Sequence, residues 1–208
     1  MMELVVLVDK NNKEIGTASK DTVHTVSTPL HRGFSLFLFN SRNEILLTKR
    51  SKSKKTFPGV WTNTVCGHPA PRESVVEAAK RRLNDELGLM NEDVRNLREV
   101  APYRYRFADA NGIVENEICP ILVAYADAEP QPNSNEIDAW KWIAWEAFLE
   151  DIKKNPHIYS PWSIEEARIL QNLNFFNRSI RHCSNVVPVG GSSTKKCVAC
   201  DHDGVVGT

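Results

Sequence analysis

Apolar and polar positions along the first third of the chain predict short strands joined by polar turns. Leu4–Asp9 and Ile15–Ser19 are β-like runs on either side of a polar turn. Phe34–Phe39 is almost wholly apolar, which favours a strand buried on both faces. The polar segment Asn40–Asn43 then predicts a turn into a hairpin partner at Glu44–Lys49.

The clearest helical period lies between Glu73 and Leu87, where apolar residues recur every three or four positions. This spacing predicts an amphipathic helix, and Gly88 stands where a helix C-cap is expected. Before it, Ser51–Pro58 is a basic loop without apolar period, and Gly59–Pro69 is a short β-like piece that enters a Gly/Pro turn.

The second half of the chain again alternates between strands and helices. The pattern predicts three strands, over Val100–Phe107, Ile113–Tyr125 and Ala139–Ile143. Two helices are predicted after them, over Trp145–Ile152 and Ile164–Phe176. The order of elements predicts an α/β class, α+β layered fold, with a mixed central β-sheet sandwiched between helices. We expect one domain over residues 1–180 and a flexible C-terminal tail over 181–208.

Composition narrows the class of protein without naming a function. The 208 residues hold 26 basic and 26 acidic side chains, so no overall field attracts nucleic acid or an anionic membrane. The apolar run at the N-terminus is too short for a signal peptide, and no window approaches the ~20 apolar residues of a membrane span. Five irregularly spaced cysteines are unlike a disulfide framework, so we expect a cytoplasmic protein.

Three histidines and two glutamates are candidate metal ligands. Glu115 and Glu117 are two positions apart in a predicted strand, so their side chains share a face and repel one another unless a cation lies between them. His24, His31 and His68 stand near the other candidate segments. Such a mixture of imidazoles and carboxylates suits Zn or Mn better than Mg. A lone histidine is more often structural, so the interpretation depends on the whole group.

The helix and the turn before it resemble the Nudix box, a loop–helix–loop in which acidic side chains hold divalent metal near a diphosphate. Gly67, Glu73 and the segment Arg81–Leu89 match the pattern, but Arg82 and Asp85 replace two of its glutamates. A guanidinium binds phosphate oxygens in a bidentate manner, so the substitution at 82 converts a metal ligand into a diphosphate ligand. The alternative is a helix whose charges are merely solvated.

Two longer strings resemble the signature segments of type I isopentenyl diphosphate isomerases, which have a Nudix-like fold. They are Gly59–Pro69, which contains Thr-Asn-Thr-Val-Cys-Gly-His, and Gly112–Glu117, which ends in Glu-Asn-Glu. The likeness extends from about Leu4 to about Phe176. It implies interconversion of isopentenyl and dimethylallyl diphosphate by protonation and deprotonation of the alkene through a carbocation-like intermediate.

The resemblance implies roles for four residues around the alkene. Cys66 and Glu117 match the family's thiol and carboxyl group, which face each other across the reacting carbons. Tyr105 matches a tyrosine that hydrogen-bonds this carboxyl group. Trp162 matches a tryptophan that lies over the carbons, where an indole face attracts a cation. The sequence leaves open which of Cys66 and Glu117 protonates the substrate.

The resemblance also implies two metal sites and a diphosphate site. One Mn²⁺ or Zn²⁺ would be held by His24, His31, His68, Glu115 and Glu117. Mg²⁺ would bind with the substrate diphosphate, and its protein ligand would be Glu86. The diphosphate itself would be held by Lys20, Arg50, Lys54 and Arg82. The implied partner is a small allylic or homoallylic diphosphate, with the protein a monomer or weak homo-oligomer.

Two other functions and one further motif stay open. A Nudix-type diphosphate hydrolase would need the full acidic box, against which Arg82 and Asp85 argue. A metal- and diphosphate-binding module without turnover would not need Cys66 or Glu117. In the tail, Cys197 and Cys200 form a single Cys-x-x-Cys pair that we interpret as incidental.

Overall fold

Residues 3–173 of the chain are described by a computed structural model. The chain divides into two compact units, Met1–Ala167 and Arg168–Thr208, and the layers described below belong to the first. The expected domain boundary near residue 180 and the Cys197–Cys200 pair lie outside the described residues, so both stay predictions. No helix among the described residues is long and apolar enough to cross a membrane.

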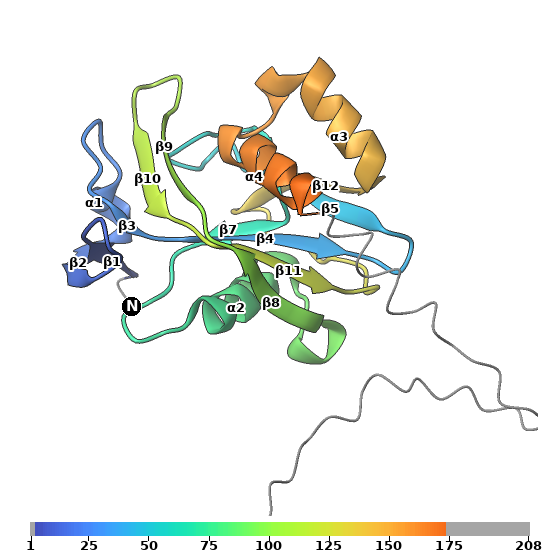
Figure 1. The fold of residues 1–208 in the computed structure, drawn as a ribbon, viewed down its shortest axis with the longest axis horizontal. Helices are drawn as coiled ribbons and strands as arrows, with labels where there is room; N and C mark the ends of the chain where they lie inside the picture. The colour runs from blue at the N-terminus through green and yellow to red at the C-terminus, as the bar shows by residue number, and fades with distance from the viewer. Residues whose placement is uncertain (1–2, 174–208) are drawn as a thin grey trace, which may run out of the picture. The chain divides into compact units, whose positions relative to one another are not determined.

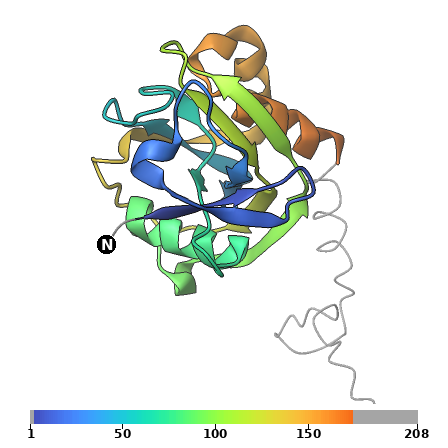
Figure 2. The same ribbon diagram turned by 90° about the vertical axis from the view of Figure 1, so that its left-hand side faces the viewer.

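A five-stranded mixed sheet contains the N-terminal hairpin and two strands from the middle of the chain (Figure 1). Its order is β2-β1-β3-β10-β9, with β1 (Leu4–Val8), β2 (Glu14–Ser19), β3 (His31–Arg32), β9 (Arg104–Ala108) and β10 (Val114–Ile118). The short strand β3 pairs antiparallel with β1 and parallel with β10. Figure 2 shows the hairpin of β1 and β2 beside the four-residue helix α1 (Lys20–Val23). The predicted N-terminal hairpin is confirmed.

A seven-stranded sheet forms the larger layer. Its strands are β4 (Phe34–Phe39), β5 (Glu44–Arg50), β6 (Trp61–Thr62), β7 (Val65–Gly67), β8 (Arg95–Ala101), β11 (Ile121–Tyr125) and β12 (Ile137–Ala144). Their main order is β12-β5-β4-β11-β8. The short strands β6 and β7 pair with β5 and β4, respectively. All six residues of β4 are buried, which confirms a strand covered on both faces. Strands β4 and β5 form the predicted hairpin.

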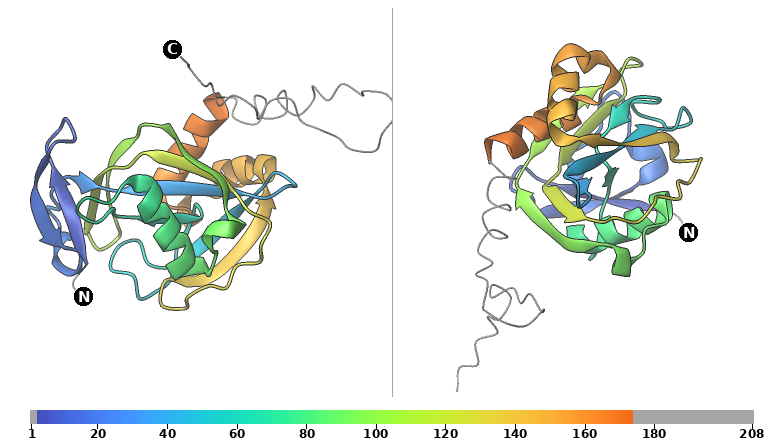
Figure 3. Two further views of the ribbon diagram at one scale, coloured as in Figure 1. Left: turned by 90° about the horizontal axis from the view of Figure 1, so that it is seen from below. Right: turned by 90° about the vertical axis from the view of Figure 1, so that its right-hand side faces the viewer.

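Helices cover both faces of the seven-stranded sheet. Helix α2 (Val75–Leu87) packs on one face (Figure 3, left), and α3 (Trp145–Lys154) packs against β5 and β12 on the other. Helix α4 spans Pro161–Asn172, and single 3₁₀ turns occur at Asn91–Asp93 and Pro156–Ile158. The sheet thus lies between helices, as the pattern of elements predicted.

Local sequence explains both ends of α2. The Ser74 side chain accepts from the backbone N–H of Glu77, and the Glu77 carboxylate accepts from the backbone N–H of Ser74, so the two residues form a capping box. Gly88 ends the helix in the left-handed conformation at φ 65°, as expected of a C-cap glycine. The apolar face packs into the core through its buried residues Ala78, Ala79, Leu83 and Leu87.

The chain crosses between the two sheets at three points, and the predicted strands were wrong at two of them. Val100–Phe107 is not one strand but β8 and β9, separated at Pro102, and Ile113–Tyr125 is divided into β10 and β11 at Pro120. Proline has no N–H to donate to a strand ladder, so each ladder ends there. The third crossing, from β3 to β4, passes through Gly33. One central sheet was therefore expected where the structure has two.

The last predicted helix differs at its start. It begins at Pro161 rather than Ile164, because proline is well suited to the first turn, where its missing N–H would have no helical partner. Its expected end at Phe176 lies outside the described residues.

Shortening one core side chain of α2 tests this packing. Leu83 is fully buried, so we expect Leu83→Ala to lower the free energy of unfolding by about 2–5 kcal/mol. Urea denaturation followed by circular dichroism measures the change. Lys80→Ala on the exposed side of the same helix is the control, and a loss at position 83 no larger than the control's would contradict the assigned packing.

Candidate active site and metal centre

The site lies where the two sheets meet. His31 on β3 is the parallel neighbour of Glu117 on β10, and Glu115 lies two residues earlier on the same strand. Alternation along a strand turns both glutamates to one face, and both are buried. The strand pairing therefore brings an imidazole and two carboxylates together, which the sequence could propose only from their spacing.

Two more histidines complete the group from other elements. His24 follows α1 directly, and His68 follows β7. One ligand atom from each of the five side chains lies within 4.8 Å of all the others, and all five residues are buried. The structure thus gathers the complete set of metal ligands expected from the sequence, which are His24, His31, His68, Glu115 and Glu117.

Hydrogen bonds orient these ligands. The carbonyl oxygen of Pro29 can only accept, so at 2.9 Å it holds a proton of His31 on Nδ1 and turns Nε2 toward the cluster. That Nε2 lies 3.2 Å from Nε2 of His68, which in turn lies 3.0 Å from Oε1 of Glu117. The ring nitrogens therefore converge on one small volume.

Two buried atoms of the cluster lack hydrogen-bond partners. Nε2 of His24 and Oε2 of Glu115 lie 3.1 Å apart, both are buried, and neither has a hydrogen-bond partner. Buried polar atoms without partners are rare in native proteins. Three imidazoles and two carboxylates are an ordinary ligand set for a divalent transition ion, which would satisfy both atoms. The donor set fits a divalent metal ion.

Charges within the cluster shift its pKa values in opposite directions. Burial alone would raise the pKa of Glu117, but hydrogen bonds from His31 and His68 outweigh it and hold that pKa well below its ordinary value. Burial lowers the pKa of His68. Burial would also lower the pKa of His31, yet the contact with Glu117 raises it overall. The free protein therefore holds Glu117 as a carboxylate.

Gly33 leaves the room that Glu117 occupies. A Cβ atom at position 33 would lie 1.8 Å from Oε2 of Glu117, a distance that no two nonbonded atoms tolerate. The glycine at this sheet crossing is thus a requirement of the carboxylate's position.

Cys66 lies on β7, opposite Ser35 of β4. Its Sγ donates to Oδ1 of Asn63 at 3.2 Å and lies 3.5 Å from Oγ of Ser35. Burial raises the pKa of this thiol to about 12, so it is protonated at neutral pH. The fully buried Cys119 also contacts the Ser35 hydroxyl, at 3.4 Å.

Aromatic rings enclose the space beside Cys66. Trp162 stacks on Tyr105 at 5.6 Å with an interplanar angle of 17°, and Phe57 meets the indole edge-on at 4.9 Å. Among the hydrogen bonds of residues 3–173 none joins Tyr105 to Glu117, although the two are direct neighbours across β9 and β10. The role expected of Tyr105 beside this carboxyl group stays a prediction. The tyrosine ring is held in a stack between Trp162 and Phe107.

One cavity of about 240 Å³ joins these parts. Cys66, Glu117, Tyr105 and Trp162 line it together with the ligands His24, His68 and Glu115 and the cationic residues Lys20, Arg50, Lys54, Lys55 and Arg82. The thiol and the carboxylate thus share a cavity, and the four expected diphosphate ligands line it too. Glu86 is not among its lining residues.

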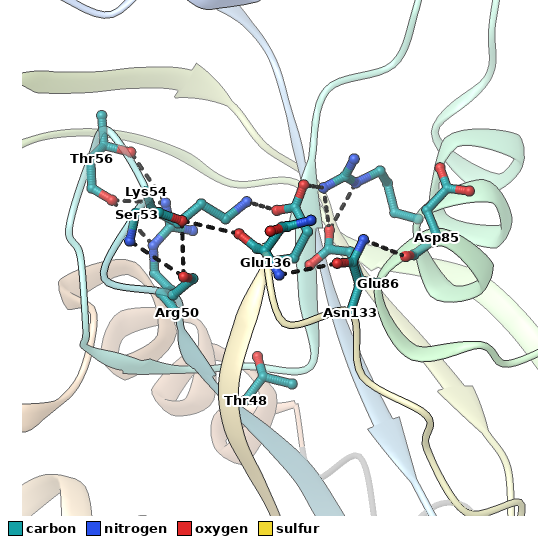
Figure 4. A network of polar contacts seen from close by, with 12 residues as sticks. Thr48, Arg50, Ser53, Lys54, Thr56, Asp85, Glu86, Asn133 and Glu136 are labelled. Carbon is teal, nitrogen blue, oxygen red and sulfur yellow. Dashed lines mark hydrogen bonds and ion pairs between the residues drawn. The ribbon is translucent and has the colours of Figure 1, made fainter.

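Carboxylates hold three of these cations. Lys20 contacts Glu3 at 2.9 Å, Arg82 contacts Glu86 at 2.7 Å, and Lys54 forms an ion pair with Glu136. Figure 4 shows Lys54, Glu86 and Glu136 gathered in one network. Arg50 donates instead to backbone carbonyls of the basic loop and lies 5.7 Å from the Trp162 ring, and Lys55 donates to the backbone carbonyl of Asp21.

Two residues that contact the site, Glu136 and Thr56, were not predicted from the sequence. The Thr56 hydroxyl donates to Oε1 of Glu115, and Glu136 contacts cations that are more than 50 residues away in sequence. Glu136 lies just before a predicted strand, and no local sequence pattern indicates an ion pair with residues so far away. Thr56 could have been suspected from its place in the basic loop.

Comparison with known proteins identifies the family of this chain. The NUDIX domain model matches residues 29–162. A crystal structure of DR0079 from Deinococcus radiodurans superposes with a TM-score of 0.65 at 22% identity, covering 80% of this chain and 98% of that one. The chain belongs to the Nudix family.

Closer relatives define the group within that family. Isopentenyl-diphosphate Delta-isomerase of Saccharopolyspora erythraea is 47% identical over 83% of this chain and 88% of its own length. The isomerase of Kocuria rhizophila is 44% identical over 80% of this chain and 91% of its own. Within the Nudix family, the chain belongs to the isopentenyl-diphosphate Delta-isomerases.

Adding one methyl group at position 33 tests the metal centre. We expect Gly33→Ala to displace the Glu117 carboxylate and to lower bound transition metal well below one ion per chain, while the fold survives. Elemental analysis of the purified variant measures this, with circular dichroism as the check on folding. Full metal content in Gly33→Ala would show that Glu117 is not a ligand.

The pH dependence of metal binding follows from the same charges. Because the contact with Glu117 raises the pKa of His31 above 6.5, this imidazole holds a proton up to a higher pH in the metal-free protein. A metal ion must displace that proton, so its affinity rises with pH and is lost as the pH falls through the raised pKa of this imidazole. Competition with a chromophoric chelator at several pH values measures the affinity, and a flat profile would exclude these imidazoles as ligands.

Proposed function

We propose that this isomerase interconverts isopentenyl and dimethylallyl diphosphate with Cys66 and Glu117 as its acid–base pair. The observation that carries the proposal is their common cavity, with the histidine–glutamate cluster, two aromatic rings and five cationic side chains around it. A thiol and a carboxylate are then available to one small substrate, whose diphosphate faces the cations.

The reaction adds one proton to the alkene and removes another from a neighbouring carbon. Protonation forms a C–H bond and leaves a tertiary carbocation, and loss of a proton from the adjacent carbon forms the new double bond. Cys66 is protonated at neutral pH and Glu117 is a carboxylate in the free protein. Because the reaction is reversible, the group that donates in one direction accepts in the other.

The aromatic wall protects the cation between the two steps. Trp162 is 1% exposed and presents its ring to the cavity lined by Cys66 and Glu117. An indole face stabilises a nearby cation by about 0.5–2 kcal/mol. Exclusion of water by Trp162, Tyr105 and Phe57 prevents capture of the cation as an alcohol.

Two metal ions are part of the proposal. His24, His31, His68, Glu115 and Glu117 would hold Mn²⁺ or Zn²⁺, which when bound orients the Glu117 carboxyl group. Mg²⁺ would enter with the substrate diphosphate, with Glu86 as its protein carboxylate. Burial raises the pKa of Glu86 in spite of its contact with Arg82, so a further cation beside it is favourable. Lys20, Arg50, Lys54 and Arg82 would bind the diphosphate oxygens.

We propose a cytoplasmic location and a monomer or weak homo-oligomer. Cys66 and Cys119 are free thiols, which suits a reducing compartment. The exposed large apolar side chains of the described residues are Ile15, Val26, Met90 and Leu173, and so small a number favours a protein that buries little apolar surface against a second copy.

Removal of the thiol tests the acid–base pair. We expect Cys66→Ala to lower kcat for isopentenyl diphosphate by about 10²–10⁴-fold, the usual contribution of a positioned acid or base. Proton NMR of the product mixture, with Mg²⁺ and Mn²⁺ present, measures conversion to dimethylallyl diphosphate.

Cys119→Ala is the matched control, since it removes a neighbouring thiol that contacts the same Ser35 hydroxyl but does not line the cavity. Near-normal turnover by Cys66→Ala would overturn the assignment. Release of phosphate without isomer from the unmodified protein would favour a diphosphate hydrolase instead.

A further inference from the structure

Glu136 contacts two of the cations at the diphosphate end of the cavity. Its carboxylate forms an ion pair with Lys54 of the basic loop and lies 3.3 Å from Nη2 of Arg82 on α2. Burial alone would raise the pKa of Glu136, yet the two cations outweigh it and hold the pKa below its ordinary value. The side chain is therefore a carboxylate shared between two segments that are distant in sequence.

The backbone around Glu136 is fixed from two sides. The N–H groups of Gln131 and Asn133 donate to the carbonyls of Leu87 and Glu86, at the C-terminal end of α2, at 2.7 and 2.8 Å. The Glu136 carbonyl accepts from the N–H of Ser51 at 2.9 Å, which joins the same loop to the basic segment. Figure 4 shows this junction, with Glu136 between Lys54 and Glu86. The carboxylate is thus held in place before any substrate binds.

Lys54 and Arg82 line the cavity, whereas Glu136 and Glu86 do not. Two cations that face one cavity repel each other, and a carboxylate shared between them removes that repulsion. The same carboxylate also lowers the attraction of the site for an anion. With Glu86 bound to Arg82, two cations and two carboxylates cancel, so a diphosphate arriving alone meets no excess of positive charge from this group.

We propose that Glu136 is a positioning residue that keeps Lys54 and Arg82 side by side and cancels their charge, so that the diphosphate binds tightly only together with a divalent cation. The inference rests on the proposed function for the location of the diphosphate. It adds a residue that sets the metal dependence of binding without touching the substrate.

Binding of inorganic pyrophosphate to the full chain tests the proposal. Calorimetry is carried out with the transition ion already bound, with and without added Mg²⁺ at constant ionic strength. For the unmodified protein, Mg²⁺ should raise the affinity by about tenfold or more. Glu136→Gln removes one negative charge while keeping the shape, so its affinity without Mg²⁺ should rise by about tenfold and the gain from Mg²⁺ should shrink by the same factor.

Two variants separate charge from position. Glu136→Asp keeps the charge but shortens the reach by one methylene, so the gain from Mg²⁺ should persist while the affinity for Mg–pyrophosphate falls several-fold. Glu44→Gln is the matched control: Glu44 pairs with Arg42 in the β4–β5 hairpin and is 27% exposed, against 22% for Glu136. It should bind pyrophosphate as the unmodified protein does.

Steady-state kinetics of the isomerisation give a second measurement. A variant that merely lost structure would not show a lower KM with a nearly normal kcat. At low Mg²⁺, Glu136→Gln should lower KM for isopentenyl diphosphate, while kcat at saturating Mg²⁺ stays within about threefold of normal. If Glu136→Gln leaves metal-free affinity unchanged and weakens only the Mg-dependent binding, Glu136 is a metal ligand and the inference is overturned.

The outcomes also separate this inference from the proposed function. A chain that binds Mg–pyrophosphate with the expected response at Glu136, yet produces no dimethylallyl diphosphate, would refute the isomerase mechanism and support the inference. If the unmodified protein isomerises the substrate normally and Glu136→Gln shows the same metal dependence of binding, the isomerase mechanism is supported and the inference about Glu136 is refuted.

Discussion

The structure depends on burying two carboxylates and three imidazoles in one small volume. Glu115 and Glu117 repel each other, and partnerless atoms of His24 and Glu115 remain there at a cost in free energy. A divalent cation removes both penalties at once. The strands, the glycine crossing and the hydrogen bond from His31 to Pro29 hold in place a group of side chains that fits a divalent metal ion.

The two ends of the cavity treat charge in different ways. At the histidine–glutamate cluster, buried nitrogen and oxygen atoms converge in an arrangement that fits a cation. At the diphosphate end, cations are already matched by carboxylates such as Glu86 and Glu136. Arg50, which donates to backbone carbonyls of the basic loop, adds a cation that no carboxylate of the described residues pairs with. The proposed role of Glu136 therefore concerns Lys54 and Arg82 alone.

Local patterns predicted much of the fold, and most residues expected at the site lie around one cavity. The period of α2, the Gly88 cap and the buried run of β4 all depend on neighbours in sequence, and the family strings named Cys66 and the five candidate metal ligands. The division into two sheets was not predicted, because Pro102 and Pro120 interrupt runs that otherwise have the composition of strands. Glu136 was not predicted because its ion pairs join segments that are far apart in sequence, and a pattern of neighbouring residues does not reveal such contacts.

The crossings at Gly33, Pro102 and Pro120 have a mechanical consequence. Cys66 belongs to the seven-stranded sheet through β7, and Glu117 belongs to the five-stranded sheet through β10. In the proposed mechanism the alkene lies between this thiol and this carboxyl group, so one strand of each sheet bounds its space. A shift of one sheet against the other would then change the distance between the two reacting groups.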